Sequence, residues 1–178
     1  TIKKNGEDFK KPAIIVSNHQ SLVDLLMAFS VTSSMVVVTQ GWVFKSPLFG
    51  IIVRMAGYLP ANSGIDNIDD KVKEAVANGL SVLIFPEGTR SKDLKVHRFH
   101  KGAFYFAEKY NVDILPAVIY GSGMIFAKNQ PQYVANGILT MEFLPRITPD
   151  DTRFGEDIKQ KSKNIRAYII EYLEKMKV

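Results

Sequence analysis

The chain has 178 residues, of which 46% are hydrophobic and 23% charged, a composition typical of a globular domain and not of a disordered segment. It contains no cysteine, which excludes disulfide bonds, thiolate metal sites and a cysteine nucleophile. The formal net charge of +5 favours anionic partners, namely nucleic acid, an acidic membrane surface or a phosphorylated substrate.

Signals for strands and helices alternate along the chain. The β-branched run from Ala13 to Val16 predicts a buried strand, and Leu22 to Val31 has apolar residues at helical spacing. Gly79 follows a helical segment, as expected for a left-handed glycine that closes a helix. The remaining patterns predict, in chain order, a strand at 35–39, a helix at 47–56, an extended piece at 58–61, a helix at 65–78, a strand at 81–85, a helix at 102–110, strands at 114–120 and 138–143, and a long amphipathic helix at 154–176.

The alternation of elements and the nearly continuous apolar strands predict an α/β fold, with a mixed, mostly parallel sheet flanked by helices on both faces. In such sheets, ligands bind at the carboxyl ends of the strands. His19 and Glu87 both follow predicted strands directly. We therefore expect their two loops to share one pocket.

The sequence has no run that approaches the roughly 18 consecutive apolar residues of a membrane span, and no basic and then apolar leader opens it. We therefore expect a protein that is soluble or peripheral to a membrane. We interpret residues 1–178 as a single domain. Because the sequence begins at Thr1 and not at methionine, it is also consistent with a piece excised from a longer chain.

His19 lies where the first strand gives way to a helix, and Asp24 follows it closely. Imidazole accepts a proton near neutral pH, and a carboxylate one turn away can fix its tautomer and stabilise the imidazolium. Asp24 stands among aliphatic residues, where a carboxylate needs a partner. The spacing therefore predicts a general base, His19, oriented by Asp24. Because no nucleophilic side chain is evident beside them, the pattern suggests that the substrate supplies the attacking hydroxyl.

Glu87, Gly88, Thr89 and Arg90 form a predicted substrate-binding loop. Glycine permits a ligand to approach the backbone, threonine offers a hydroxyl, and arginine can hold a phosphate through two hydrogen bonds. Together these residues predict a site for an anion or a polar head group. The alternative is an ordinary turn with a surface ion pair.

Basic residues continue after this loop. Lys101 is a further candidate for substrate binding, and the other cations of the segment are Lys92, Lys95 and Arg98. A solvated basic loop is the alternative, because isolated surface charges often contribute little. We expect His97 and His100, which lie in the same segment, to be structural and not catalytic.

Four blocks of residues resemble a known family, the glycerolipid acyltransferases, and in particular the 1-acylglycerol-3-phosphate acyltransferases, of which this chain looks like a divergent bacterial member. They occur in the family's order over positions 13 to 120: Ser-Asn-His-Gln-Ser-Leu-Val-Asp at 17 to 24, Phe-Pro-Glu-Gly-Thr-Arg-Ser at 85 to 91, His-Lys-Gly-Ala-Phe at 100 to 104, and Ile-Leu-Pro-Ala-Val at 114 to 118.

The resemblance implies a glycerol-3-phosphate acyltransferase-like fold and the transfer of a fatty acyl group from acyl-CoA or acyl-carrier protein to a hydroxyl or amine of a lipid acceptor. It implies that His19 is the general base, that Asp24 orients it, and that residues 87–90 bind the acceptor. It implies neither a metal nor a cofactor other than the acyl donor, and no nucleic acid. We expect the protein to be cytoplasmic, peripheral on the inner face of the membrane.

One block departs from the family pattern. Members that accept glycerophosphates usually have a phosphate-binding arginine there, whereas residues 57–64 read Gly-Tyr-Leu-Pro-Ala-Asn-Ser-Gly. The loss of one charge-assisted hydrogen bond removes about 1.5–3 kcal/mol. Two interpretations stay open. Either the acceptor lacks a terminal phosphomonoester, or Arg90 and Lys101 hold its phosphate instead.

Two other classes of function account for parts of the sequence. A serine or thioester hydrolase would use a nucleophile elbow, of which Gly121-Ser122-Gly123 supplies only a part. A basic lipid-binding or nucleic-acid-binding module would explain the charge, but it would leave His19 and Asp24 unexplained.

An apolar segment with flanking cations is a candidate for contact with a bilayer, where a lipid acceptor would enter. A buried core helix is the alternative, because helical spacing alone does not distinguish the two. The apolar residues of this segment are Trp42, Phe44, Leu48, Phe49, Ile51 and Ile52, and the cations are Lys45 and Arg54.

Overall fold

The computed structural model describes residues 1–47, 49–55, 57–61, 66–126 and 137–177, with the backbone alone for residues 49, 52, 61, 66 and 67. Its elements follow in the order β1 (Ile2–Lys3), β2 (Ala13–Ser17), α1 (Val23–Val31), β3 (Met35–Gln40), the 3-10 helix η1 (Gly41–Lys45), α2 (Phe49–Met55), β4 (Leu59–Ala61), α3 (Asp66–Ala77), β5 (Ser81–Ile84), α4 (Gly102–Lys109), β6 (Asp113–Tyr120), α5 (Ser122–Ile125), β7 (Thr140–Phe143) and α6 (Ile158–Lys175).

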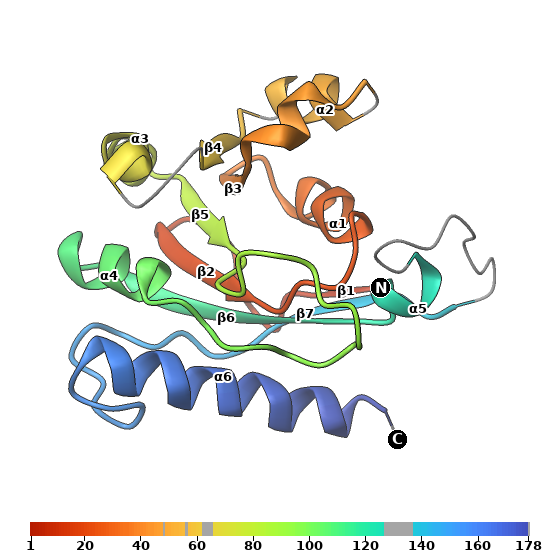
Figure 1. The fold of residues 1–178 in the computed structure, drawn as a ribbon. Coiled ribbons are helices and arrows are strands. Elements are labelled where there is room, and N and C mark those ends of the chain that lie inside the picture. The colour runs from red at the N-terminus through yellow and green to blue at the C-terminus, as the bar shows by residue number, and fades with distance from the viewer. Residues whose placement is uncertain (48, 56, 62–65, 127–136, 178) are drawn as a thin grey trace.

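A seven-stranded sheet runs through the described part of the chain in the order β1-β7-β6-β2-β5-β3-β4 (Figure 1). The central strand β2 pairs in parallel with both β5 and β6. Parallel pairing continues from β5 through β3 to β4, whereas β7 runs antiparallel to β6. The structure thus confirms the predicted mixed, mostly parallel sheet.

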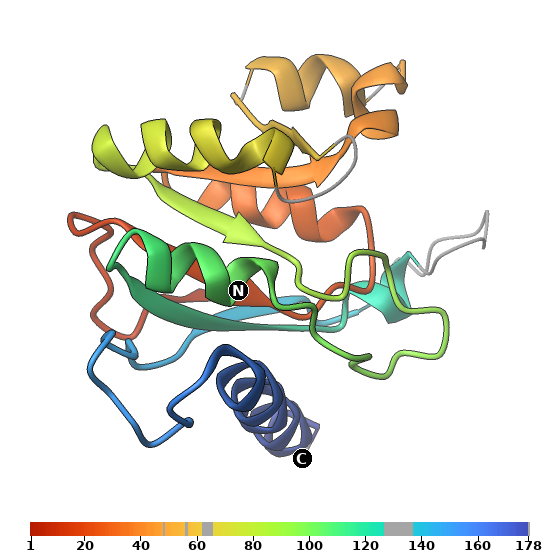
Figure 2. The ribbon, with the colours of Figure 1, turned by 60° about the vertical axis from the view of Figure 1, so that its left-hand side comes forward.

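Helices cover both faces of this sheet, as predicted. Alternate residues of each buried strand point to opposite faces, so that Ile14 and Val16 belong to one hydrophobic core and Ile15 to the other. Helices α3, α4 and α6 close the first core, and α1, η1 and α2 close the second. Figure 2 shows α3, α4 and α6 in front of the sheet and α1 behind it.

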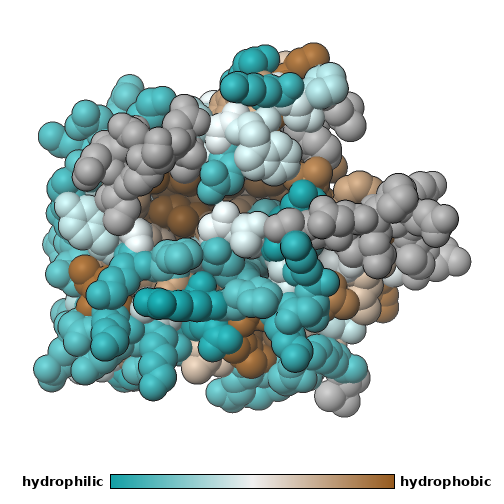
Figure 3. All heavy atoms as spheres, viewed as in Figure 1, coloured by the Kyte–Doolittle hydropathy of each residue, from teal (hydrophilic) through white to brown (hydrophobic). Residues whose placement is uncertain are grey.

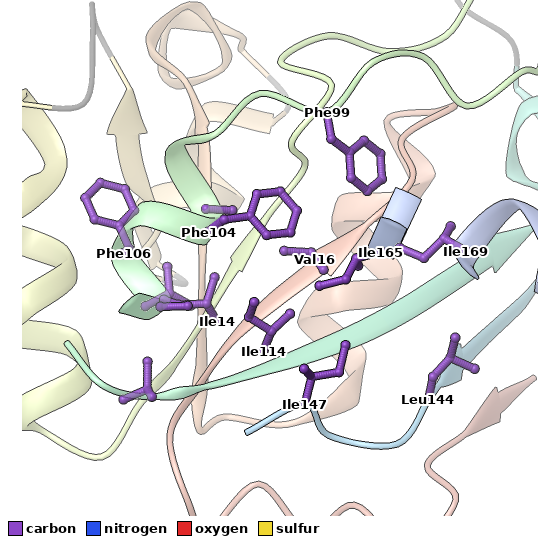
Figure 4. Packing of buried hydrophobic residues seen from close by; sticks show 14 of the residues in the cluster. Ile14, Val16, Phe99, Phe104, Phe106, Ile114, Leu144, Ile147, Ile165 and Ile169 are labelled. Atoms are coloured by element: carbon purple, nitrogen blue, oxygen red, sulfur yellow. The ribbon is translucent and has the colours of Figure 1, made fainter. Parts of the chain in front are cut away.

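The closing helix α6 packs on the sheet through one apolar stripe. Ile165, Ile169 and Leu173 recur at a spacing of one helical turn, and all three are buried. Figure 4 shows the first two directed toward the core residues of the central strands. Full burial of one such side chain contributes about 1.5–3 kcal/mol. This stripe is the reason why the sequence predicts a long amphipathic helix here.

Several predicted boundaries differ from the structure for local reasons. The closing helix begins at Ile158 and not at Phe154, because Gly155 has a left-handed backbone (φ 114°) and Asp157 caps the helix by accepting a hydrogen bond from the Gln160 N–H at 2.7 Å. Helix α2 begins at Phe49. Three elements are not predicted from the sequence: β1, η1 and α5 have two, five and four residues and are too short for a periodic pattern.

The sheet places two predicted loops side by side. Strands β2 and β5 are parallel neighbours, with Val16 opposite Ile84. The chain that leaves β2 carries His19, and the chain that leaves β5 carries residues 86–101, which form a long loop before α4. Both loops therefore begin at the same edge of the sheet, where α/β proteins bind ligands.

Candidate active site

His19 and Asp24 form a hydrogen-bonded pair. Asp24 lies in the first turn of α1, fully buried, and its Oδ2 atom is 2.8 Å from the Nδ1 atom of His19. The same oxygen accepts hydrogen bonds from the backbone N–H groups of Gln20 at 2.8 Å and Ser21 at 2.9 Å. The carboxylate therefore holds the loop as well as the ring. A proton on Nδ1 leaves the lone pair of Nε2 available to a substrate.

The imidazole of His19 is fixed on its other sides too. Its ring stacks on Phe85 of the neighbouring strand end, with 4.1 Å between the ring centres and 21° between the planes. The backbone N–H of Ser91 donates to the His19 carbonyl at 2.9 Å. Only 13% of the His19 side chain is exposed. A general base must be held within hydrogen-bonding reach of its proton, and the hydrogen bond to Asp24 and the stack on Phe85 restrict the movement of the ring.

Asn18 anchors the start of this loop to β6. Its side-chain amide donates to the carbonyl of Ile119 at 2.7 Å, and its side-chain oxygen accepts from the N–H of the same residue at 2.9 Å. The last paired residue of β2 is Ser17, and at the next position the side chain of Asn18 makes the hydrogen bonds to β6 in place of the backbone. This role leaves no signal in the sequence, because the partner lies 101 positions away and belongs to the backbone.

Glu87 holds the His19 loop through a hydrogen bond to its backbone. Its Oε1 atom accepts from the backbone N–H of His19 at 2.8 Å, and its Oε2 atom accepts from the backbone N–H of His97, also at 2.8 Å. Only 5% of the residue is exposed. Burial raises the pKa of the carboxyl, and the two backbone hydrogen bonds partly offset that effect. Both carboxylate oxygens of Glu87 therefore accept hydrogen bonds from backbone N–H groups. The contact of Glu87 with substrate stays a prediction.

Residues 88–90 lie where the sequence predicts them, beside His19. Gly88 has a left-handed backbone (φ 69°), which glycine adopts without strain. Its carbonyl accepts a hydrogen bond from Gln40 at 3.3 Å. Burial lowers the pKa of the Arg90 guanidinium, and the negative charge of Asp24 partly offsets that effect. Gly88, Thr89 and Arg90 all line one cavity with His19.

This cavity has a volume of about 620 Å³ and two chemically different parts. The apolar part includes Leu22, Leu25, Val38, Val43, Ile68, Ile84 and Phe106. The polar part includes His19, Gln40, Thr89, Arg90 and His100, and no carboxylate occurs among the described residues that line it. Figure 3 shows hydrophobic atoms at the bottom of a hollow over β5, next to a band of hydrophilic residues. The arrangement fits a ligand with an apolar chain and an anionic or polar head group.

Two other residues from the sequence analysis occupy different surroundings. Lys101 is exposed, and the described lining of the cavity includes its neighbours His100 and Gly102 but not Lys101 itself. Its role in substrate binding stays a prediction. Ser122, the candidate nucleophile of a hydrolase, is fully buried and lies outside the described lining of this cavity. It therefore does not offer a nucleophile to His19.

No group of three or more histidine, aspartate or glutamate side chains within the described ranges is arranged to hold a metal ion. No helix in the same ranges has both the length and the apolar character needed to cross a membrane.

The site is thus a histidine–carboxylate pair at the strand ends of an α/β sheet, facing a cavity with an apolar part and a polar part that contains Arg90. Such a site suits general-base catalysis on an amphipathic substrate. A model of the Acyltransferase family matches residues 1–120. The chain belongs to this family.

The chain is similar to proteins named 1-acyl-sn-glycerol-3-phosphate acyltransferases. A chloroplastic 1-acyl-sn-glycerol-3-phosphate acyltransferase of Arabidopsis thaliana is 37% identical over 119 residues, which cover 64% of this chain and 33% of the relative. The beta form of the same enzyme from Homo sapiens is 31% identical over 144 residues, which cover 77% of this chain and 51% of the relative. The chain thus spans only a part of each of these proteins.

A solved structure shows the same fold. The crystal structure of the 1-acyl-sn-glycerophosphate acyltransferase PlsC from Thermotoga maritima matches with a TM-score of 0.78 and 24% sequence identity, over 99% of this chain and 72% of that one. The expected membership of the acyltransferase family and the expected α/β fold are therefore confirmed.

Proposed function

We propose that this chain transfers a fatty acyl group from a thioester donor to a hydroxyl of 1-acylglycerol-3-phosphate, with His19 as the general base. The observation that carries the proposal is the 2.8 Å contact between Asp24 and the Nδ1 atom of His19 in a cavity that also contains Arg90. The reaction named for the related proteins of Arabidopsis thaliana and Homo sapiens supports this choice.

The chemistry needs one proton acceptor and two bound substrates. The Nε2 atom of His19 takes the proton of the acceptor hydroxyl while the hydroxyl oxygen attacks the thioester carbonyl carbon. Asp24 stabilises the imidazolium that forms. The carbon–sulfur bond then breaks, and the departing thiolate takes the proton from the imidazolium. The substrate supplies the nucleophile, so no covalent enzyme intermediate is required.

The cavity favours a phosphorylated acceptor over a neutral one. Arg90 lines it together with His19, and none of the described lining residues is acidic. A guanidinium can hold a phosphate through two hydrogen bonds. The apolar part accommodates an acyl chain next to this head group. Of the two interpretations that the missing arginine of the 57–64 segment leaves open, the cavity supports the one in which Arg90 holds the phosphate.

The acyl donor is acyl-CoA or acyl-carrier protein. Both present the acyl group as a thioester on a flexible arm, and both are acidic, which suits a chain with a net charge of +5. The donor is consumed as a co-substrate, and the proposed mechanism uses no further cofactor.

We also propose that η1 and α2 contact the membrane from its cytoplasmic side. Trp42, Ile51 and Met55 are exposed by 53%, 60% and 83%. Lys45 and Arg54, on the same two elements, are exposed as well and can approach anionic lipid head groups. Phe44 is partly buried and packs against the second core, and Leu48 and the side chains of residues 49 and 52 lie outside the described parts of the chain. Since Trp42 also lines the cavity, this surface adjoins the proposed lipid site.

The test is an acyl transfer assay with purified protein. Lysophosphatidic acid is supplied with acyl-CoA or with acyl-carrier protein, and the acylated product is identified by mass. The proposal predicts phosphatidic acid, with thiol release only when the acceptor is present. A hydrolase would release thiol without an acceptor, and a binding module would release none.

A further inference from the structure

His100 lines the same cavity as His19 and Arg90, although the sequence analysis expects only a structural role for it. The residue is exposed to solvent, and its backbone N–H donates to the carbonyl of Pro86 at 2.8 Å. This hydrogen bond ties the start of α4 to the loop that follows β5. The position of His100 is therefore fixed by the backbone, while its side chain stays accessible to a ligand.

The imidazole of His100 lies next to Gly88. A side chain at position 88 would begin 3.6 Å from the Cδ2 atom and 3.8 Å from the Nε2 atom of His100. Because position 88 is glycine, this space is open to a ligand. Among the described residues, the ring nitrogens of His100 have no hydrogen-bond partner. A ring N–H of His100 is thus available to a group that enters between the imidazole and residues 88–90.

His97, only three positions earlier, gives the contrast. Its Nε2 atom lies 2.8 Å from Asp93 Oδ1 at the exposed surface, so its ring has a partner within the chain. The described lining of the cavity contains His100 and not His97. The two histidines of the same loop therefore differ in the property that matters, which is access to the ligand.

We propose that His100 binds the phosphate head group of the acceptor together with Arg90, and so makes the site selective for phosphomonoester lipids. This inference rests on the proposed function. Imidazole and guanidinium side chains reach the polar part of the cavity from two loops: His19 from the loop after β2, and Arg90 and His100 from the two ends of the loop between β5 and α4. No acidic side chain among the described lining residues opposes a dianionic ligand there. The first residues of α4, Gly102 and Ala103, also line the cavity, and the start of a helix favours a nearby anion.

The experiment measures binding in the absence of an acyl donor, so that no turnover occurs. Calorimetric titration gives the Kd of a short-chain lysophosphatidic acid and of the monoacylglycerol with the same acyl chain. The ratio of the two values reports selectivity for the phosphate. The proteins are the wild type, His100→Ala, His100→Lys and, as the matched control, His97→Ala.

We expect His100→Ala to reduce the selectivity ratio about tenfold by weakening the binding of lysophosphatidic acid, with the monoacylglycerol unaffected. His100→Lys should keep the ratio within threefold of wild type, and His97→Ala should leave it unchanged. An unchanged ratio in His100→Ala, or a wild type without preference for the phosphate, would overturn the inference. If His100→Ala binds neither lipid, the lysine variant decides: a ratio close to wild type supports the inference, and a lost preference refutes it.

The acyl transfer assay separates this inference from the proposed function. Loss of phosphate selectivity in His100→Ala, combined with a wild type that transfers no acyl group, would support the inference and refute the proposed reaction. Acyl transfer by the wild type, combined with an unchanged selectivity ratio in His100→Ala, would support the proposed reaction and refute the inference.

Discussion

Glu87 and His19 are joined by a hydrogen bond of 2.8 Å that runs from the backbone N–H of the histidine to the carboxylate. The second carboxylate oxygen accepts from the N–H of His97. Glu87 therefore connects the loop of His19, the proposed general base, to the part of the 86–101 loop that includes His97. We interpret it as a positioning residue, because it acts on the site through the backbone.

The first prediction concerns this connection. Glu87→Gln keeps the size of the side chain, but its single oxygen can accept only one of the two N–H groups, and its NH₂ would face the other. We expect kcat to fall at least about tenfold, since misplacement of a catalytic group costs rate and not ground-state affinity. The KM of the acceptor should stay within about twofold. Steady-state kinetics measure both. Glu108→Gln, on the exposed surface of α4, is the control. A raised KM with unchanged kcat would instead mean that Glu87 binds the acceptor.

The second prediction concerns Arg90. Arg90→Ala should raise the KM for lysophosphatidic acid about tenfold or more, because a charge-assisted contact to the phosphate is lost. The KM for the acyl donor should not change. Arg98→Ala, also basic but exposed, is the control. Efficient use of lysophosphatidic acid by the Arg90 variant would return the choice of acceptor to a neutral or amino-bearing lipid.

The third prediction concerns the proposed membrane surface. Replacement of Ile51 and Met55 by serine removes two exposed apolar side chains from α2. If these side chains enter a bilayer, the partition coefficient onto anionic liposomes should fall at least about tenfold. Co-sedimentation at low salt measures it. Ile138→Ser is the control, since Ile138 is 74% exposed but lies before β7. Equal binding of all three proteins would argue against a role of α2 at the membrane.

The fourth prediction concerns the ion pairs that Arg146 makes at the start of β6. Arg146 donates to both carboxylate oxygens of Glu7, at 2.7 and 2.8 Å, and to Asp113 at 3.1 Å. Arg146→Met would leave two largely buried carboxylates without this partner and should lower the free energy of unfolding by about 2–3 kcal/mol at pH 7. Arg153→Met is the control, because Arg153 makes its ion pair with Asp151 at the surface. This variant should change the free energy of unfolding by less than about 0.5 kcal/mol.

The pH dependence of the same variant has a defined sign. The hydrogen bonds from Arg146 hold the pKa of Glu7 below its ordinary value of 4.5. At a pH between the lowered pKa of Glu7 in the folded state and its ordinary pKa in the unfolded state, the folded state therefore binds fewer protons. The stabilisation by Arg146 is present above pH 4.5 and is lost as the pH falls through the folded pKa. Urea unfolding should show a difference between wild type and Arg146→Met that is constant above pH 4.5 and shrinks below it. A difference that grows on acidification would contradict the assigned ion pair.

Much of the fold could be predicted from local patterns. The apolar runs that became β2 and β5 and the apolar stripe of α6 are dictated by burial, which leaves a periodic signal in the sequence. The pairing of His19 with Asp24 was equally accessible, because both residues belong to one strand-to-helix connection. Short elements such as η1 and α5 have no period to detect, and only packing against the sheet and its loops explains them.

The parts of the site that sequence reasoning missed depend on irregular backbone. Glu87 accepts hydrogen bonds from backbone N–H groups, which every non-proline residue has and which therefore leave no mark in the sequence. Lys101 and His100 are neighbours in a loop without a repeating geometry, so their order says nothing about which one faces the cavity. The conformation of residues 86–101 decides this, and it follows from tertiary contacts such as the hydrogen bond from His100 to Pro86.

The measurement that tests the central claim most directly is the acyl transfer rate of His19→Ala and Asp24→Asn beside the wild type, with thermal unfolding of each protein to show that the fold survives. A general base contributes at least about 10²-fold, so His19→Ala should lose that much of kcat or more, and Asp24→Asn should lose less. Retention of more than about a tenth of the wild-type rate by a folded His19→Ala variant would contradict the assignment of His19 as the general base.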